Sequence, residues 1–511
     1  MKKILFTLFV PLAIAVGCSD YLDVNHNPDV IEEIPSPKVL LPSAELNVAG
    51  NLMGWHFGFG GGYWVQYWTQ SYNASQFKSL CEYLPQDFNI AYNAILTGAL
   101  SNFKRITELA PKDDPTLQSY YFIGEALSIF TWQIVTDVWG DIPYLEALRG
   151  NELLLNPKFD KQEDIYADLN SRIDALLALD LSDAAAPDGK YDIIYGGDID
   201  KWYAFAGALK LKLALRLSET SGYNNADVLA YIKDANTALL TSSAKVAAGT
   251  WSDGEEGKRH PMREFQQGGA NYFSQNVIAC KSFLDYLTVN NDPRAAKLFS
   301  GTRGAFFGDF DSNGDSDGNG TADDKETYAT SAFQAATAPA IYMDLMVMSN
   351  WEVNFYIAEV YARAGDFGNA KKYYDAGVTA SLAQQGITAT DIIKTGYAVF
   401  TATAQEAAIK QIAMQKWVAN CNYQHIESFL ERNRTKYPAV NDIDIKSNRL
   451  TAWANFPVGD LTISVNGRAL LNAQLPASPQ YPASVLTRNS NAPGQKADVA
   501  QKVWWNQKAG K

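Results

Sequence analysis

The stretch NFYIAEVYARAGDFGNAKKYYDAGVTAS, residues 354–381, predicts two helices joined by a tight turn at Gly365-Asp366. Apolar residues recur at helical spacing on both sides of that turn, and glycine lets the chain reverse there. One such pair cannot bury its own apolar face, so further helices must pack against it. Its small and aromatic residues are Ala358, Ala362 and Ala370, with Tyr361, Phe367 and Tyr374.

This helical pair resembles one tetratricopeptide unit. Strand signals elsewhere are few and short, so the sequence predicts a mostly α fold, a tetratricopeptide-like helical scaffold with a loop-rich ligand-binding region at about 249–326. One predicted helix carries a basic face at Lys210, Lys212 and Arg216. The segments with helical spacing are residues 119–137, 165–179, 201–217, 351–364, 368–384 and 404–432.

The first residues, MKKILFTLFVPLAIAVGCSD, have the layout of a secretory signal peptide. Lys2 and Lys3 precede an apolar run that is too short to span a bilayer and that leads to Cys18. A bacterial lipoprotein signal is cut just before such a cysteine, which is then acylated. The alternative is an ordinary secreted protein with a chance cysteine at this place. The predicted parts are a signal peptide at 1–17, an acylated, extended tether at 18–45 and a single body at 46–511.

The formal charge of −13 argues against nucleic acid as a partner, because backbone phosphates require a basic surface. It also argues against an anionic membrane surface, so the lipid on Cys18 is the expected membrane contact. No later segment offers about 18 uncharged apolar residues. The histidines show no metal-ligand spacing, and Cys81, Cys280 and Cys421 can form at most one disulfide.

The segment DFDSNGDSDGNGTADDKE, residues 309–326, predicts a calcium loop. From Asp315 onward its spacing fits an EF-hand-type loop, in which oxygen atoms surround the ion and Gly320 permits a sharp turn. No strongly helical segment precedes it, so we expect a structural calcium clip. The alternative is a solvated acidic loop. The expected ligands are Asp315, Asp317, Asn319, Thr321, Asp323 and Glu326.

Sugar recognition requires flat aromatic surfaces and hydrogen-bonding side chains. The densest aromatic cluster is WHFGFGGGYWVQYWTQSYNASQF, residues 55–77, and a second candidate is REFQQGGANYF, residues 263–273. In the first cluster, Trp64, Trp68 and Tyr72 recur every four residues, a spacing that would place them on one face of a helix. The alternative is an aromatic stripe that packs into the core. The residues predicted to bind ligand are Trp64, Tyr67, Trp68, Tyr72, Arg263, Asn271 and Tyr272.

Short motifs follow one another between Cys18 and the tail at Trp504-Trp505. In this order they resemble the SusD/RagB family of nutrient-binding outer-membrane lipoproteins, in its SusD-like branch. Gly207 and Asn433 depart from the family pattern, where asparagine and arginine are common. The motifs are YLDVN (21–25), DVWGDIPY (137–144), WYAFA (202–206), DPR (292–294), QKW (415–417) and ERNRTKYP (431–438).

The resemblance implies a lipid-anchored protein of the outer membrane that faces the medium. Its tetratricopeptide-like helices would dock on a SusC-type TonB-dependent transporter. The rest of its surface would capture an oligosaccharide, or in some members a peptide, and deliver it into that transporter without a chemical step.

Two other functions stay open on the sequence. An exported glycoside hydrolase would need two carboxylates about 5–9.5 Å apart, and carboxylates are plentiful here. However, the chain has no nucleophile elbow, phosphate loop or other recognisable catalytic motif, so we expect no enzyme and no catalytic residues. A tetratricopeptide scaffold that binds only proteins would leave the aromatic loop region without a purpose.

Overall fold

The computed structural model describes residues 36–511, apart from residues 253, 256, 267–274, 323–327 and 332–342. The predicted signal peptide, Cys18 and most of the predicted tether therefore lie outside the described residues. Residues 36–511 group into one unit by their contacts. The end of the predicted tether is not extended, because Pro37–Leu52 forms helix α1. Proline suits the first turn of a helix, where its missing N–H is not needed.

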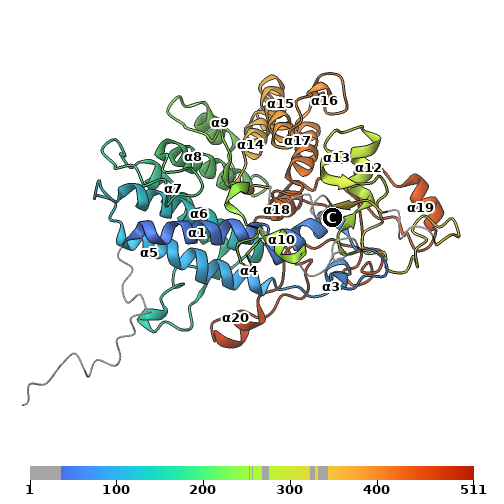
Figure 1. Cartoon of the computed structure of the whole chain (residues 1–511), viewed down its shortest axis with the longest axis horizontal. Coiled ribbons are helices and arrows are strands. Elements are labelled where there is room, and N and C mark those ends of the chain that lie inside the picture. The colour runs from blue at the N-terminus through green and yellow to red at the C-terminus, as the bar shows by residue number, and fades with distance from the viewer. Residues whose placement is uncertain (1–35, 253, 256, 267–274, 323–327, 332–342) are drawn as a thin grey trace, which may run out of the picture. The chain divides into compact units, whose positions relative to one another are not determined.

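Helices dominate the described residues, which confirms the predicted mostly α fold class (Figure 1). None of these helices is long and apolar enough to cross a membrane. The longer ones are α1, α5 (Ser101–Leu109), α6 (Gln118–Trp139), α7 (Gln162–Leu177), α8 (Ile199–Arg216), α9 (Asn225–Lys233), α12 (Lys281–Val289), α14 (Asn350–Arg363), α15 (Phe367–Gln384), α17 (Gln405–Asn420) and α18 (His425–Thr435). The shorter ones are α2 (Gly61–Trp64), α3 (Lys78–Cys81), α4 (Asn89–Ala94), α10 (Pro261–Gln266), α13 (Ala295–Leu298), α16 (Asp391–Lys394), α19 (Arg449–Asn455) and α20 (Ala483–Arg488).

Helices α14 and α15 are the predicted helical pair. Gly365 turns the chain with a φ of +76°, and the side chain of Asp366 caps α15 by accepting a hydrogen bond from the Asn369 amide at 3.0 Å. The two helices approach closely, since a Cβ at Gly377 would lie 2.8 Å from the ring of Phe355. Helix α17 packs against both, as the neighbouring orange ribbons in Figure 1 show.

The helix predicted over residues 404–432 is instead two helices, α17 and α18. The helical structure is interrupted between them from Cys421 onward, and Asn422 has a φ of +70°. His425 stabilises the break, because its Nε2 accepts a hydrogen bond from the Asn422 amide at 2.8 Å. Its Nδ1 lies 2.6 Å from the carbonyl oxygen of Gly58 and donates to it. The thiols of the described chain are buried and free: Cys81, Cys280 and Cys421.

Buried ion pairs join α18 to α8, α14 and α17, and join α8 to α6. Arg434 of α18 donates to both carboxylate oxygens of Glu359 on α14 at 2.6 Å, and to those of Glu431 at 2.9 and 2.7 Å. Burial opposes ionisation of Glu359, but the neighbouring arginines outweigh it and lower its pKa to about 2. We call this set the helix network. Its members are Asp137, Lys212, Arg216, Glu352, Glu359, Lys416, Glu427, Glu431 and Arg434.

The predicted basic face of α8 is wrong for two of its three residues. The side chains of Lys212 and Arg216 are only 2% and 1% exposed. Lys212 lies 2.6 Å from Glu352 and 2.7 Å from Glu427, and Arg216 also contacts Glu427 at 2.7 Å. Only Lys210 reaches the surface. Helical spacing identifies a polar face, but it does not show which distant acidic residues cover it.

A four-stranded antiparallel sheet in the described part of the chain gathers segments far apart in sequence. Two of its strands are joined by the loop that begins after Ser300. The sheet places this loop beside the segment that follows Thr69. The strand order is β1 (Trp68–Thr69), β5 (Ile278–Ala279), β7 (Thr330–Ser331) and β6 (Phe299–Ser300). Separate pairs are β2 (Ile142–Pro143) with β3 (Phe159–Asp160), β4 (Ala244–Val246) with β8 (Leu345–Met348), and β9 (Val440–Asn441) with β10 (Leu461–Thr462).

Replacing Arg434 by methionine should destabilise the protein strongly, because Glu359 would keep a buried charge with only Arg363 beside it. We expect the free energy of unfolding to fall by about 3–5 kcal/mol in urea denaturation. The control is Arg149→Met, which removes an exposed ion pair with Glu152 and should leave the urea midpoint unchanged. Equal midpoints for the two variants would contradict a structural role of the helix network.

Candidate functional site

Three residues predicted to bind ligand lie in the core. Trp64 ends α2, Tyr67 follows it, and Trp68 begins β1, so Trp64 and Trp68 do not share a helical face with Tyr72 as predicted. Trp64 is 2% exposed, and the other two are 0% exposed. The indole of Trp64 donates to the carbonyl of Leu80 at 3.3 Å, and the Tyr67 hydroxyl lies 2.6 Å from Ser428 Oγ. The structure therefore corrects the prediction for these three and favours the aromatic core stripe.

The other predicted ligand residues have different positions. Tyr72 is half-buried beside the acidic loop, since a Cβ at Gly314 would lie 3.4 Å from its ring. The amide of Ser71 donates to the carbonyl of Gln275 at 2.8 Å, which holds this segment next to the residues before β5. Arg263 is half-buried on α10. The remaining two, Asn271 and Tyr272, lie outside the described residues.

Residues 309–321, which we call the acidic loop, fold through side-chain hydrogen bonds to their own backbone. Asp315 Oδ2 accepts from the Gly320 amide at 3.0 Å, and Asn319 Oδ1 accepts from the Thr321 amide at 2.7 Å. Gly320 has a φ of +90°, a conformation that other residues rarely adopt. The second oxygen of Asp315, Oδ1, is buried and has no hydrogen-bond partner among the described residues.

Basic side chains neutralise carboxylates of the acidic loop. Arg449 of α19 pairs with Asp309, with Nη2 at 2.7 Å from Oδ1, and Arg303 lies 3.1 Å from Asp317. A third pair joins Lys446 and Asp311.

Four of the predicted calcium ligands lie in the described part of the acidic loop: Asp315, Asp317, Asn319 and Thr321. Within the described residues, no group of three or more His, Cys, Asp or Glu could hold a metal ion. Calcium requires six to eight oxygen ligands, so the described loop residues do not make a site by themselves. The predicted ligands Asp323 and Glu326 lie outside the described residues.

Trp453 is a surface aromatic residue that the sequence analysis missed. It lies on α19 and is half-buried. The Lys281 Nζ atom is 4.3 Å and the Arg303 guanidinium carbon is 4.8 Å from the centre of its ring, so cation–π contacts orient it. Because Arg303 also pairs with Asp317, Trp453 lies beside the acidic loop. In the sequence, the only indication of this residue is a single tryptophan in the short segment RLTAWAN, residues 449–455.

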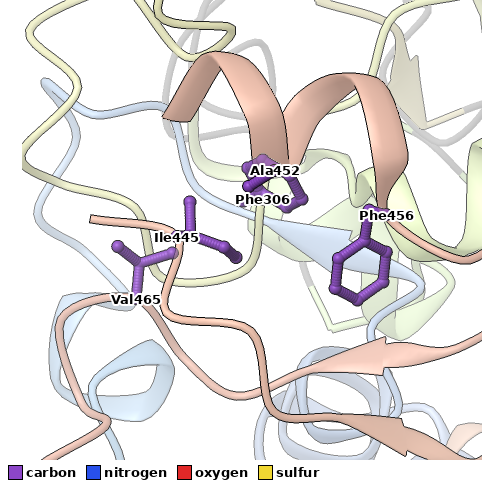
Figure 2. Close-up of a cluster of buried hydrophobic side chains, with 5 residues drawn as sticks. All are labelled: Phe306, Ile445, Ala452, Phe456 and Val465. Atoms are coloured by element: carbon purple, nitrogen blue, oxygen red, sulfur yellow. The ribbon is translucent and has the colours of Figure 1, made fainter. Parts of the chain in front are cut away.

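A small apolar cluster holds α19 in place. Figure 2 shows α19 lying over Phe306, with Phe456 at its end. The ring centres of Phe306 and Phe456 are 5.7 Å apart, and Trp453 packs on the cluster with its ring centre 5.5 Å from that of Phe306. The cluster therefore fixes Trp453 on a rigid support. Its members are Phe306, Ile445, Ala452, Phe456 and Val465.

We define the acidic-loop face as residues 309–321 together with Tyr72 and Trp453. It combines two partly exposed aromatic rings with carboxylate, amide and hydroxyl groups. Aromatic rings offer flat apolar area at a low cost in conformational entropy, and the polar groups can accept hydrogen bonds from hydroxyls. This chemistry suits a polar ligand with apolar ring faces.

A concavity of about 270 Å³ elsewhere in the described chain is lined by tyrosines together with Lys410, Gln411, Gln415 and Asp460. Tyr286 and Tyr397 form part of its wall. Gln415 donates to the Tyr397 hydroxyl at 3.0 Å and accepts from Arg294 at 2.7 Å. Both amide atoms of Gln411 hold the backbone of residues 399–402. The amides of this cavity are therefore committed to internal bonds, and the acidic-loop face is the better candidate.

Comparison with known proteins places this fold in a family. Residues 29–456 match a SusD-like family described as "Starch-binding associating with outer membrane". The chain belongs to this SusD-like family. The resemblance found in the sequence is thereby confirmed, and it covers most of the chain. No curated protein sequence matches this chain.

Solved structures share the SusD-like fold along almost the full chain. A chitin-binding protein has a TM-score of 0.66 at 20% identity, covering 92% of this chain and 100% of its own. A chitin-binding SusD homolog from Flavobacterium johnsoniae has a TM-score of 0.68 at 17% identity, covering 93% and 99%. A SusD homolog from Bacteroides fragilis has a TM-score of 0.66 at 20% identity, covering 93% and 100%. At such identities the likeness shows the fold.

Replacing Trp68 by alanine should unfold or strongly destabilise the protein, because the side chain is fully buried. We expect a loss of about 3–5 kcal/mol in the free energy of unfolding. The conservative change Trp68→Phe should keep the fold and leave ligand retention in native affinity gels unchanged. Loss of retention by a folded Trp68→Phe variant would return this residue to the binding site.

Proposed function

We propose that this SusD-like protein captures an oligosaccharide at the acidic-loop face and passes it to a SusC-type TonB-dependent transporter, with no chemical step. The family description names starch binding and association with the outer membrane, and two similar structures carry names that include chitin binding. The observation that carries the proposal is Trp453, a partly exposed ring on a rigid support beside hydrogen-bonding side chains.

The proposed recognition has two parts. A sugar ring stacks its apolar face on the exposed part of Trp453 or Tyr72, where the aromatic surface replaces water. Its hydroxyls then bond to oxygen atoms of the acidic loop, including those of Asn319 and Thr321, which are exposed. Cations beside Trp453 hold the ring, so little side-chain freedom is lost on binding.

The proposal that there is no chemical step rests on the lack of a recognisable catalytic motif in the sequence. Asp309 and Asp317 are each held by an arginine. A glycoside hydrolase needs one carboxylic acid that keeps its proton and a second carboxylate positioned across the scissile bond. Incubation of the protein with each retained glycan, followed by an assay for released sugar, tests the hydrolase alternative. Released sugar would overturn the proposal.

Delivery to a transporter requires that the protein stay at the membrane. We propose that acyl chains on Cys18 anchor it to the outer membrane, facing the medium, and that α14 and α15 dock on the barrel. Two attachments raise the effective concentration of each partner for the other, so the pair stays together. A peptide as the ligand is the alternative within the family, and a panel of glycans and peptides distinguishes the two.

Replacing Trp453 or Tyr72 by alanine should abolish or strongly reduce retention in a native affinity gel that contains the bound glycan. Loss of one stacking residue should weaken binding by about 0.5–1.5 kcal/mol or more. The matched control is Tyr191→Ala, which removes a half-buried tyrosine outside the proposed site. Unchanged migration of both site variants, with circular dichroism that shows an intact fold, would remove the acidic-loop face from recognition.

We also propose a structural calcium ion in residues 315–326, and the unpartnered, buried Oδ1 of Asp315 supports it. If calcium binds, millimolar calcium should raise the thermal midpoint of the wild type, and a chelator should lower it. Asp315→Asn should lose this difference, whereas Asp391→Asn, on exposed α16, should keep it. If calcium and chelator give equal midpoints for the wild type, the arginine and lysine partners alone neutralise the loop.

A further inference from the structure

A groove lies between α7, α8 and the segment that follows α9, on elements that the acidic-loop face does not use. These helices are neighbours in the scaffold (Figure 1). The volume of the groove is about 370 Å³, within the range of about 300–1,000 Å³ that is typical of small-molecule pockets. We call it the α8 groove. Its aromatic, amide and charged side chains are Asp174, Tyr203, Lys210, Tyr231, Asp234 and Asn236.

The α8 groove owes its shape to a close approach of the chain at Gly207. A Cβ at Gly207 would lie 2.1 Å from the main-chain oxygen of Ala238, so a larger residue does not fit unless that segment moves. The Tyr231 hydroxyl donates to the carbonyl oxygen of Gly207 at 2.9 Å, which ties the end of α9 to α8. Thr237 Oγ1 donates to the carbonyl oxygen of Tyr231 at 2.8 Å and folds the segment after α9. The wall of the groove is therefore part of the backbone packing.

Two aromatic rings in the α8 groove are held in fixed positions. Tyr203 is half-buried, its hydroxyl donates to the carbonyl oxygen of Leu177 at 2.8 Å, and its ring stacks on that of Phe122 with centres 5.8 Å apart. Tyr231 is also half-buried, and the Lys210 Nζ atom lies 4.8 Å from the centre of its ring. Rings that are already ordered offer flat apolar area, and binding costs them little side-chain freedom.

Polar groups beside these rings are free to meet a ligand. The side-chain amide of Asn236 is exposed and has no hydrogen-bond partner among the described residues. Asp234 Oδ1 accepts from the Asn236 main-chain N–H at 2.9 Å, and its second oxygen is unpartnered among the same residues. An amide both donates and accepts, and a carboxylate accepts from a hydroxyl. The tyrosine-lined cavity differs, because its amides are already bonded.

The charges of the α8 groove favour a neutral ligand. The Lys210 ammonium lies 2.6 Å from Asp174 Oδ1, so the lysine already has a counter-charge. Asp234 has no cation within 4.0 Å among the described residues. An anionic ligand would therefore meet an unpaired negative charge and find no unpaired lysine in the lining to balance it.

We propose that the α8 groove is a second binding site for a neutral glycan, separate from the acidic-loop face. A sugar ring stacks on Tyr203 or Tyr231, and its hydroxyls bond to Asn236 and Asp234. This inference rests on the proposed function, because it takes a glycan as the ligand. Two sites on one protein increase retention on a polymer, since release from one site leaves the other bound.

Calorimetric titration of the full chain with maltohexaose and chitohexaose tests the α8 groove directly. Both are neutral, and they represent starch and chitin. The titrations use the Trp453→Ala variant, which weakens the acidic-loop face, and weak binding of a neutral chain should remain. Adding Tyr231→Leu should weaken that binding about three- to tenfold, because a stacking ring is lost. Adding Asn236→Ala instead should weaken it about two- to tenfold, because a hydrogen bond is lost.

Matched controls in the same Trp453→Ala background separate recognition from damage to the fold. Tyr191→Leu changes a half-buried tyrosine and Asn151→Ala an exposed asparagine, both outside the α8 groove. Each should leave the residual affinity unchanged. Hexagalacturonate, an anionic chain, should not bind in this background, and binding as tight as that of the neutral chains would contradict the assignment to a neutral glycan.

The outcomes distinguish this inference from the proposed function. Equal affinity of Trp453→Ala with and without Tyr231→Leu or Asn236→Ala overturns the second site and leaves the proposed function standing. Loss of all binding in Trp453→Ala, when the wild type binds a neutral chain, has the same meaning. A wild type that binds neither neutral chain overturns the second site. A wild type that also retains no glycan of the panel overturns the proposed function.

Discussion

The burial of charge on α18 is the constraint on which the helical scaffold depends. Glu427, Glu431 and Arg434 lie on one short helix, but their partners lie on α8, α14 and α17, and Arg216 of α8 in turn pairs with Asp137 of α6. A buried ion pair is strongly destabilised when one partner is missing, so these helices must come together as a set. The tetratricopeptide-like pair is thereby fixed to the rest of the scaffold by charge as well as by apolar packing.

The same helix positions the segments that carry the acidic-loop face. His425 at the start of α18 bonds to Gly58, and α18 packs on α2, so the aromatic segment of residues 55–77 is held in the core. That segment continues into β1, whose sheet gathers the loops around Tyr72 and the acidic loop. The cluster around Phe306 then fastens α19 and Trp453 beside that loop. Core aromatic residues therefore support the face without lying on it.

Helix positions could be predicted because apolar residues recur at helical spacing, and most predicted helices exist within a few residues. The break between α17 and α18 could not, because it depends on His425 meeting a backbone atom far away in sequence. For the same reason the sequence predicted a basic helix face that includes Lys212 and a ligand site that includes Trp68. The local pattern is the same whether a face is covered by solvent, by ligand or by another helix. Trp453 could not be identified from the sequence, because its position beside the acidic loop depends on residues that are distant in sequence.

A glycan bound at the proposed site would cover the rings of Trp453 and Tyr72. Hydroxyl-radical footprinting with a retained oligosaccharide measures the accessibility of each aromatic side chain in the free and bound protein. We expect protection of Trp453 and Tyr72, with Tyr286 and Tyr397 of the tyrosine-lined cavity unchanged. Protection of Tyr286 and Tyr397 while Trp453 stays as reactive as in the free protein would contradict it.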